Sequence, residues 1–135
     1  MKRQGVINQP LSSALAGLGH GDYFLLCDAG FPIPKSVERI DLALCFGVPS
    51  MQQCLEAILR EIVVQKVTYA AEMPGLNAEG AAYIQRLFKN QEVVQVSQSE
   101  LVRLAQGAKF IVRSGELGCY SNILLEAASG VEQFK

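Results

Sequence analysis

The chain has 135 residues and a mass of 14.7 kDa, a length that suits one domain with its own hydrophobic core. Charged residues make up 19% of the chain and the mean hydropathy is +0.20, so we expect some apolar surface to lie in subunit contacts. The formal net charge of −1, with no basic run beyond the start, argues against a nucleic-acid or membrane-surface partner and leaves a small neutral ligand.

The first predicted element is a short helix near the N-terminus. Pro10 suits its first turn, Leu11, Leu15 and Leu18 form an apolar stripe, and Gly19 is expected to end it. The basic start resembles a signal peptide only loosely, because polar residues interrupt its apolar part. No stretch approaches the roughly 18 apolar residues of a membrane helix, so we predict a cytoplasmic protein.

A short buried strand is predicted next, at residues 23–28. The segment YFLLCD is too short and too continuously apolar for a half-exposed strand. It is therefore predicted to be a strand buried on both faces, which is typical of parallel sheets. Gly30 permits unusual backbone angles, while Pro32 and Pro34 fix φ. The loop after this strand is therefore expected to be rigid.

The rest of the chain alternates between strands and helices. Apolar spacing and capping signals predict helices from Ser50, from about Asn77 and from Ser97. Residues 63–73 form an apolar run. Other short apolar segments predict strands at 38–47, 92–97, 109–116 and 122–127. This alternation favours an α/β fold in one domain over residues 1–135, with a mostly parallel sheet covered on both faces.

Motifs for several kinds of chemistry are absent. The glycines of GLGHGD do not form the dinucleotide-binding pattern and precede a strand instead of following one. Phosphate-loop, hydrolase-elbow and zinc-protease motifs do not occur. The four cysteines lack C-x-x-C spacing and the chain has one histidine, so we predict no metal site and a reducing compartment.

Ligands of such sheets bind outside the carboxyl ends of the strands, where the chain places Asp28, residues 113–116 and the residues around Tyr120. His20 lies between two glycines and is the one side chain that exchanges protons near neutral pH without assistance. An ordinary explanation exists for each: a helix-end histidine, a loop aspartate, an ion pair between Arg113 and Glu116, and turn residues near 120.

Six segments of the sequence, in this order, resemble the D-ribose pyranase family of sugar ring isomerases. They are LGHGD (18–22), CDAGFPIPKS (27–36), RIDLAL (39–44), GVPS (47–50), VRSGE (112–116) and YSNILL (120–125). The segment DAGFPIPKS resembles the pyranase branch and not the fucose mutarotase branch. The resemblance spans nearly the whole chain and implies a three-layer α/β/α domain with a mixed, mostly parallel sheet.

The resemblance also implies an activity and the residues that perform it. Members interconvert the pyranose and furanose forms of D-ribose without a cofactor, in the cytoplasm, upstream of ribokinase. The family pattern makes His20 the proton donor and Asp28 a group that binds a sugar hydroxyl or orients the histidine. Residues 120–122 (Tyr120, Ser121 and Asn122) would bind the sugar. We expect His20 and Asp28 to lie at the entrance of the same sugar site.

Gln98 departs from the family pattern, because related pyranases carry a substrate-binding histidine in this region. Glutamine can donate to and accept from a hydroxyl, but it does not transfer a proton. We therefore expect Gln98 to bind the sugar and to affect sugar preference more than the type of reaction.

The resemblance further implies a ring-shaped homo-oligomer, commonly a decamer, with active sites near subunit boundaries. Tyr120 and Asn122 could then serve a His20 from a neighbouring chain. Two other functions remain open: a mutarotase for another sugar such as L-fucose, and a non-catalytic sugar-binding or transport-associated subunit. A titrating histidine between glycines favours catalysis over binding alone.

Overall fold

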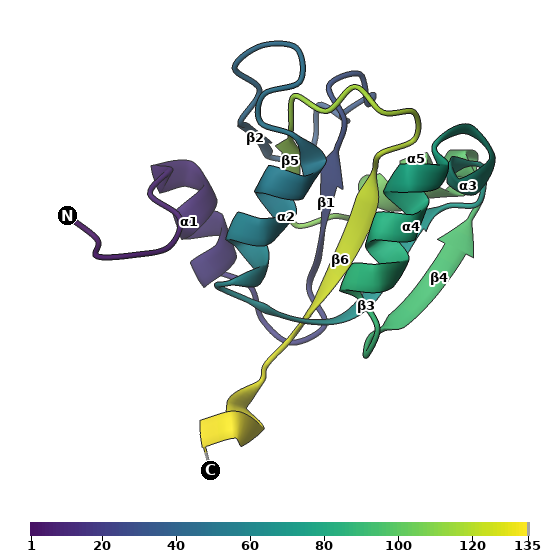
Figure 1. The fold of residues 1–135 in the computed structure, drawn as a ribbon. Coiled ribbons are helices and arrows are strands. Elements are labelled where there is room, and N and C mark those ends of the chain that lie inside the picture. Colours follow the sequence, from purple (N-terminus) through teal and green to yellow (C-terminus); the bar gives the residue numbers. More distant parts are fainter. Residues whose placement is uncertain (135) are drawn as a thin grey trace.

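The computed structural model describes residues 1–134, so Lys135 of the predicted domain lies outside the described residues. One six-stranded sheet carries helices on both faces (Figure 1). The strands are β1 Tyr23–Cys27, β2 Arg39–Asp41, β3 Val63–Ala70, β4 Glu92–Val96, β5 Ile111–Arg113 and β6 Ile123–Ala128. The helices are α1 Gln9–Ala16, α2 Met51–Leu59, α3 Met73–Leu76, α4 Ala78–Leu87 and α5 Gln98–Ala105, followed by a 3-10 turn at Val131–Phe134.

The sheet is mixed and mostly parallel, as predicted. Its order is β2-β5-β1-β6-β3-β4, and β6 runs antiparallel to both of its neighbours while the other pairs are parallel. The carboxyl ends of the parallel strands therefore lie at the same edge as the start of β6. We call this the carboxyl edge, and the opposite one, where β1 begins and β6 ends, the amino edge (Figure 1).

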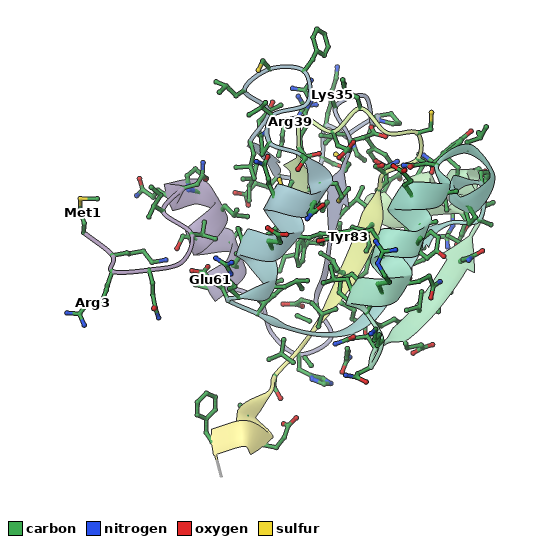
Figure 2. The ribbon with its side chains drawn as sticks, viewed as in Figure 1. Met1, Arg3, Lys35, Arg39, Glu61 and Tyr83 are labelled. Carbon is green, nitrogen blue, oxygen red and sulfur yellow. The ribbon has the colours of Figure 1, made fainter. Side chains whose placement is uncertain are left out.

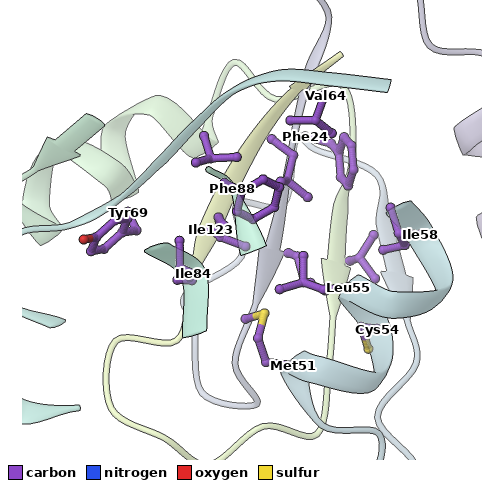
Figure 3. Packing of buried hydrophobic residues seen from close by; sticks show 14 of the residues in the cluster. Phe24, Met51, Cys54, Leu55, Ile58, Val64, Tyr69, Ile84, Phe88 and Ile123 are labelled. Atoms are coloured by element: carbon purple, nitrogen blue, oxygen red, sulfur yellow. The ribbon is translucent and has the colours of Figure 1, made fainter. Parts of the chain in front are cut away.

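Hydrophobic cores on both faces hold the helices to the sheet. Side chains along β1 alternate, so Phe24 contributes to the larger core and Leu25 to the smaller one. Figure 3 shows the larger core, where Leu55 of α2 and Ile84 of α4 pack near Ile123 of β6. The smaller core lies under α5 and includes Leu101, Ala105, Ile111 and Leu124. This arrangement confirms the predicted three layers.

The capping signals located two helices correctly. Ser50 and Gln53 form a complete capping box at α2. Ser97 accepts from the backbone of Glu100 at α5, but the Glu100 carboxylate pairs with Arg103 instead of returning to the cap. The predicted end of α1 was wrong, because Gly17 and not Gly19 is its C-terminal cap.

Two strands are shorter than predicted. Only Arg39–Asp41 of the segment 38–47 is a strand, and the loop after it exposes 81% of Leu44 and 86% of Phe46. The reason is that β5, the one neighbour of this edge strand, also ends at Arg113, and the chain after β2 turns back on itself through a bridge between Cys45 and Val48. Likewise, only Ile111–Arg113 of 109–116 is a strand. Within residues 1–134, no helix is both long enough and apolar enough to cross a membrane.

Candidate active site

The carboxyl edge brings Asp28 together with the turn at residues 120–122. The backbone N–H of Asp28, directly after β1, donates to Oδ1 of Asn122 at 2.9 Å. Asn122 and Ser121 are buried, being only 2% and 3% exposed, and Tyr120 packs against both hydrophobic cores. Polar side chains held this rigidly suit recognition of a small polar ligand.

The Asp28 carboxyl group is half-buried and turns the backbone of its own loop. Its Oδ1 accepts from the N–H of Gly30 at 3.0 Å, so the interpretation as a turn-forming aspartate is confirmed. Burial raises the pKa of Asp28 above its ordinary value, with a smaller contribution in the same direction from the charge of Glu116. The hydrogen bonds from Gly30, Asn122 and Phe31 oppose this rise in pKa without cancelling it.

Gln98 lies at the same edge, at the first position of α5 after β4. Its backbone N–H donates to the Glu72 carboxylate, at 3.1 Å and 3.0 Å to the two oxygens. Its Oε1 atom is buried and has no hydrogen-bond partner among the described residues. A buried acceptor without a partner costs about 1–3 kcal/mol. Satisfying this atom therefore requires a donor that the described residues do not supply.

Three strand spacings separate Gln98 from Asp28, because β6 and β3 lie between β4 and β1. At about 4.8 Å per spacing, the strand ends are roughly 14 Å apart. Tyr120 precedes β6, which lies between these two strands. A sugar that contacts all three side chains would therefore lie over the start of β6.

His20 lies at the amino edge, away from these residues. The Gly21 N–H donates to the carbonyl of Ala127 at 2.8 Å, and the Ser129 N–H donates to Nδ1 of His20 at 3.2 Å. The five residues of β1 separate this edge from Asp28 by about 16 Å. The expectation that His20 and Asp28 lie at the entrance of one site was wrong for a single chain, because the extended strand β1 places them at opposite edges of the sheet.

The turn around His20 is held by charged neighbours. Oδ2 of Asp22 accepts from the Gly19 N–H and from Nζ of Lys109, both at 2.7 Å. The hydrogen bond from Lys109 lowers the pKa of Asp22 most, followed by the bond from Gly19. Gly21 adopts a φ of +85°, which favours glycine, so the second glycine shapes the turn.

The contact with Ser129 also determines where the neutral imidazole carries its proton. A nitrogen that accepts a hydrogen bond from a backbone N–H bears no proton of its own. Nδ1 of His20 is that acceptor, so the proton lies on Nε2. Because the side chain is exposed, the neutral ring can donate a hydrogen bond from Nε2 to a bound molecule.

Arg113 and Glu116 do not pair with each other, so the interpretation as a mutual ion pair was wrong. Arg113 donates to the carbonyl of Ala29 at 3.1 Å and pairs with Asp41 at 3.0 Å. The Glu116 carboxylate accepts from the backbone N–H groups of Met51 and Gly118, both at 2.9 Å. Glu116 therefore ties the start of α2 to the chain that leads into residues 120–122, a role without a local sequence signal.

A hollow of about 800 Å³ lies between α2 and α4 and adjoins the carboxyl edge. Tyr83 of α4 lines it (Figure 2), together with Met51, Asn77, Glu116 and Ser121. Of the predicted sugar-binding residues, only Ser121 lies in its wall. The hollow and the Asp28 side of the edge are therefore different surfaces that meet at residues 118–121.

Replacing Asp28 with asparagine should raise stability at neutral pH. A carboxyl group whose pKa is raised by folding stabilises the fold fully below its unfolded value of 3.8, and this contribution disappears as pH rises through the folded pKa. At pH 7 the buried carboxylate is therefore unfavourable, and we expect Asp28→Asn to melt at a higher temperature than the wild type. The gain should shrink toward pH 4, as thermal unfolding by circular dichroism can measure.

Asp22→Asn is the matched control, because the pKa of Asp22 is lowered and the sign reverses. Its contribution to stability is present above the unfolded value of 3.8 and is lost as pH falls through the folded pKa. We expect Asp22→Asn to melt lower than the wild type at pH 7, with the difference fading in acid. A fall in melting temperature for Asp28→Asn at pH 7 would contradict the assignment of burial as the dominant effect.

Taken together, the fold and the site define a small α/β protein with a polar ligand site at the carboxyl edge and an exposed imidazole at the amino edge. Hydrogen-bonding groups and an imidazole of this kind suit a class of protein that binds a small hydroxylated molecule. The chain belongs to the RbsD / FucU transport protein family, whose model matches residues 1–131. This confirms the family resemblance found in the six sequence segments.

The sequence is similar to those of individual family members over nearly the full length of the chain. The chain is 39% identical to D-ribose pyranase of Bacillus subtilis (strain 168) over 127 residues, which cover 94% of this chain and 97% of the relative. It is 44% identical to D-ribose pyranase of Streptomyces coelicolor over 125 residues, covering 93% of this chain and 95% of the relative. Both relatives are named for the activity that the sequence resemblance implies.

The fold is also similar to those of solved structures. The structure of Bacillus subtilis RbsD complexed with D-ribose superposes with a TM-score of 0.91 at 39% identity, covering 95% of this chain and 98% of that one. A fucose mutarotase from Streptococcus pneumoniae in complex with L-fucose has a TM-score of 0.78 at 22% identity, covering 95% and 98% of the two chains. At this lower identity the second likeness shows the fold alone.

Proposed function

We propose that this protein is an isomerase that interconverts the β-pyranose and β-furanose forms of D-ribose. The observation that carries the proposal is the full-length similarity to two D-ribose pyranases at 39% and 44% identity. The orphaned Oε1 of Gln98, at the same edge of the sheet as Asp28 and the turn at residues 120–122, supports a hydroxylated ligand at the carboxyl edge.

The reaction needs few groups. Ring opening breaks the bond between the anomeric carbon and the ring oxygen, as the anomeric hydroxyl loses a proton and the ring oxygen gains one. The open chain then closes through a different hydroxyl. In our proposal the imidazolium form of His20 donates the proton from Nε2; in that form Nδ1 also carries a proton and no longer accepts from the Ser129 N–H. Asp28, Gln98, Tyr120, Ser121 and Asn122 bind the hydroxyl groups and hold the open chain for reclosure.

A single chain does not complete this site, since His20 and Asp28 lie at opposite edges of the sheet. We therefore propose that His20 of one copy reaches the carboxyl edge of another copy in a homo-oligomer, a decameric ring as the family resemblance implies. The exposed Leu44 and Phe46, in the loop after β2, supply apolar surface suited to a contact between copies. All four cysteines are free, which supports the cytoplasm as its location.

Saturation-transfer NMR on D-ribose at equilibrium tests the function. We expect the protein to accelerate exchange between the β-pyranose and β-furanose signals relative to a sample without protein. Binding of ribose without acceleration would contradict catalysis and favour a sugar-binding subunit. Acceleration of anomer exchange in L-fucose, with none in ribose, would identify a mutarotase for another sugar, with Gln98 as the first residue to examine.

A further inference from the structure

One amide side chain, that of Asn77, connects helix α4 to the turn at residues 119–121. Its Oδ1 accepts from the N–H of Gly80 at 3.1 Å and so caps the start of α4. Its Nδ2 donates to the carbonyl of Cys119 at 3.1 Å and to Oγ of Ser121 at 3.0 Å. Both ends of the amide are therefore used, and its two donor bonds lie on either side of Tyr120.

The turn held in this way has an unfavourable backbone. Tyr120 has a φ of +54°, and it is the only non-glycine residue among the described residues 1–134 whose φ is positive. A side-chain-bearing residue in this region is disfavoured by about 1–2 kcal/mol, so the conformation persists only where its surroundings impose it. The bonds from Asn77 to residues 119 and 121 impose it from both sides.

The Asn77 amide is closely packed between two glycines, Gly80 and Gly118. A Cβ atom added to Gly80 would lie 2.6 Å from Nδ2 of Asn77, and one added to Gly118 would lie 2.8 Å from the same atom. Real Cβ atoms essentially never approach a neighbour so closely. Glycine at both positions lets α4 and the turn approach Asn77, so the junction is a specific three-way contact.

We propose that Asn77 is a positioning residue for ring interconversion: it holds the Cys119–Ser121 turn so that Tyr120 and Asn122 face the sugar. This inference rests on the proposed function, since it concerns the sugar-binding turn of that site. Asn77 need not touch the sugar, and it acts through the backbone of its two partners. Asn122 in turn accepts from the Asp28 N–H, so displacement of the turn would also reach Asp28.

The variant Asn77→Asp separates this role from the helix cap. Aspartate caps a helix as well as asparagine does, so α4 keeps its first hydrogen bond. The carboxylate has no N–H to donate, and it places negative charge against the carbonyl of Cys119. Asn8→Asp is the matched control, because Asn8 caps α1 through Oδ1 in the same way, at 3.0 Å from the Leu11 N–H, with no link to the turn.

We expect Asn77→Asp to lower kcat/KM for D-ribose by about tenfold or more, mainly through a higher KM, because small displacements of binding groups have effects of this size. Its melting temperature should stay close to that of the wild type, and Asn8→Asp should keep wild-type kinetics. Unchanged kcat/KM in Asn77→Asp, or an equal fall in both variants, would overturn the proposal.

A crystal structure of Asn77→Asp distinguishes failure of this inference from failure of the proposed function. The inference predicts a displaced turn in which Tyr120 leaves positive φ, whatever sugar the protein uses. An unchanged turn would overturn it even if ring exchange is confirmed. Absence of ribose exchange in the wild type, together with a displaced turn in the variant, would count against the function and leave the positioning role standing.

Discussion

Replacing His20 with alanine is expected to slow the pyranose–furanose exchange of D-ribose by about 10² to 10⁴-fold, the usual contribution of a positioned acid–base group. The chain has no other histidine, so no second imidazole can take over the proton transfer. The ring is exposed and makes one hydrogen bond, from Ser129, so its loss should leave the fold intact. Saturation-transfer NMR at matched protein concentration measures the change in exchange rate.

Two further variants separate proton transfer from local structure. His20→Asn can still accept from the Ser129 N–H but does not titrate, and it should be as slow as the alanine variant. Ser129→Ala keeps the backbone N–H that contacts Nδ1 and should exchange ribose at the wild-type rate. Undiminished exchange in both His20 variants would exclude His20 as the proton donor.

Chains carrying His20→Ala and chains carrying Asp28→Asn, each expected to exchange ribose more slowly than the wild type, should restore activity when they are combined in one oligomer. If His20 comes from one copy and Asp28 from another, a mixture of His20→Ala and Asp28→Asn chains contains sites in which both residues are native. Random mixing at equal amounts makes about one quarter of the sites native, so we expect up to roughly that fraction of wild-type exchange. Co-expression with two affinity tags, followed by NMR on the doubly purified oligomer, measures it.

A second pair of variants provides the control. Asp28 and Tyr120 lie at the carboxyl edge of the same chain, where Asn122 follows Tyr120 and bonds to the backbone of Asp28. Chains carrying Asp28→Asn and Tyr120→Phe should therefore fail to rescue each other, because no site receives both native residues. Rescue by this pair, or no rescue by the first one, would contradict a site formed in this way between two copies.

The parts of the fold that depend on neighbouring residues in sequence were predicted well. Helix α2 begins at Met51 because Ser50 and Gln53 cap each other, and α5 begins after Ser97 for a related reason. The strand β1 was predicted from its continuous apolar run, since both of its faces are buried. Strand ends were predicted less well, because β2 stops where its neighbour β5 stops and not where its own residues change.

The site was predicted in part, and the failures share one cause. Residue types and the family resemblance selected Asp28 and residues 120–122, and the structure places them together at one edge. Asn77 and Glu116 were not identified as supports of that edge, since their partners lie far away in sequence. No periodicity or spacing marks a side chain whose role depends on contacts 44 or 65 residues distant.

The sequence by itself determined the α/β class, the order of the elements, the family and the residue types available for acid–base chemistry, because these follow from local patterns and from similarity along the chain. The tertiary structure decided where those residues lie relative to one another. His20 and Asp28 are eight positions apart, yet the straight strand between them places them at opposite edges, while Asp28 and Asn122 meet through an antiparallel pairing of β1 and β6. Distance in a folded chain depends on strand direction and pairing, and only the assembled sheet specifies both.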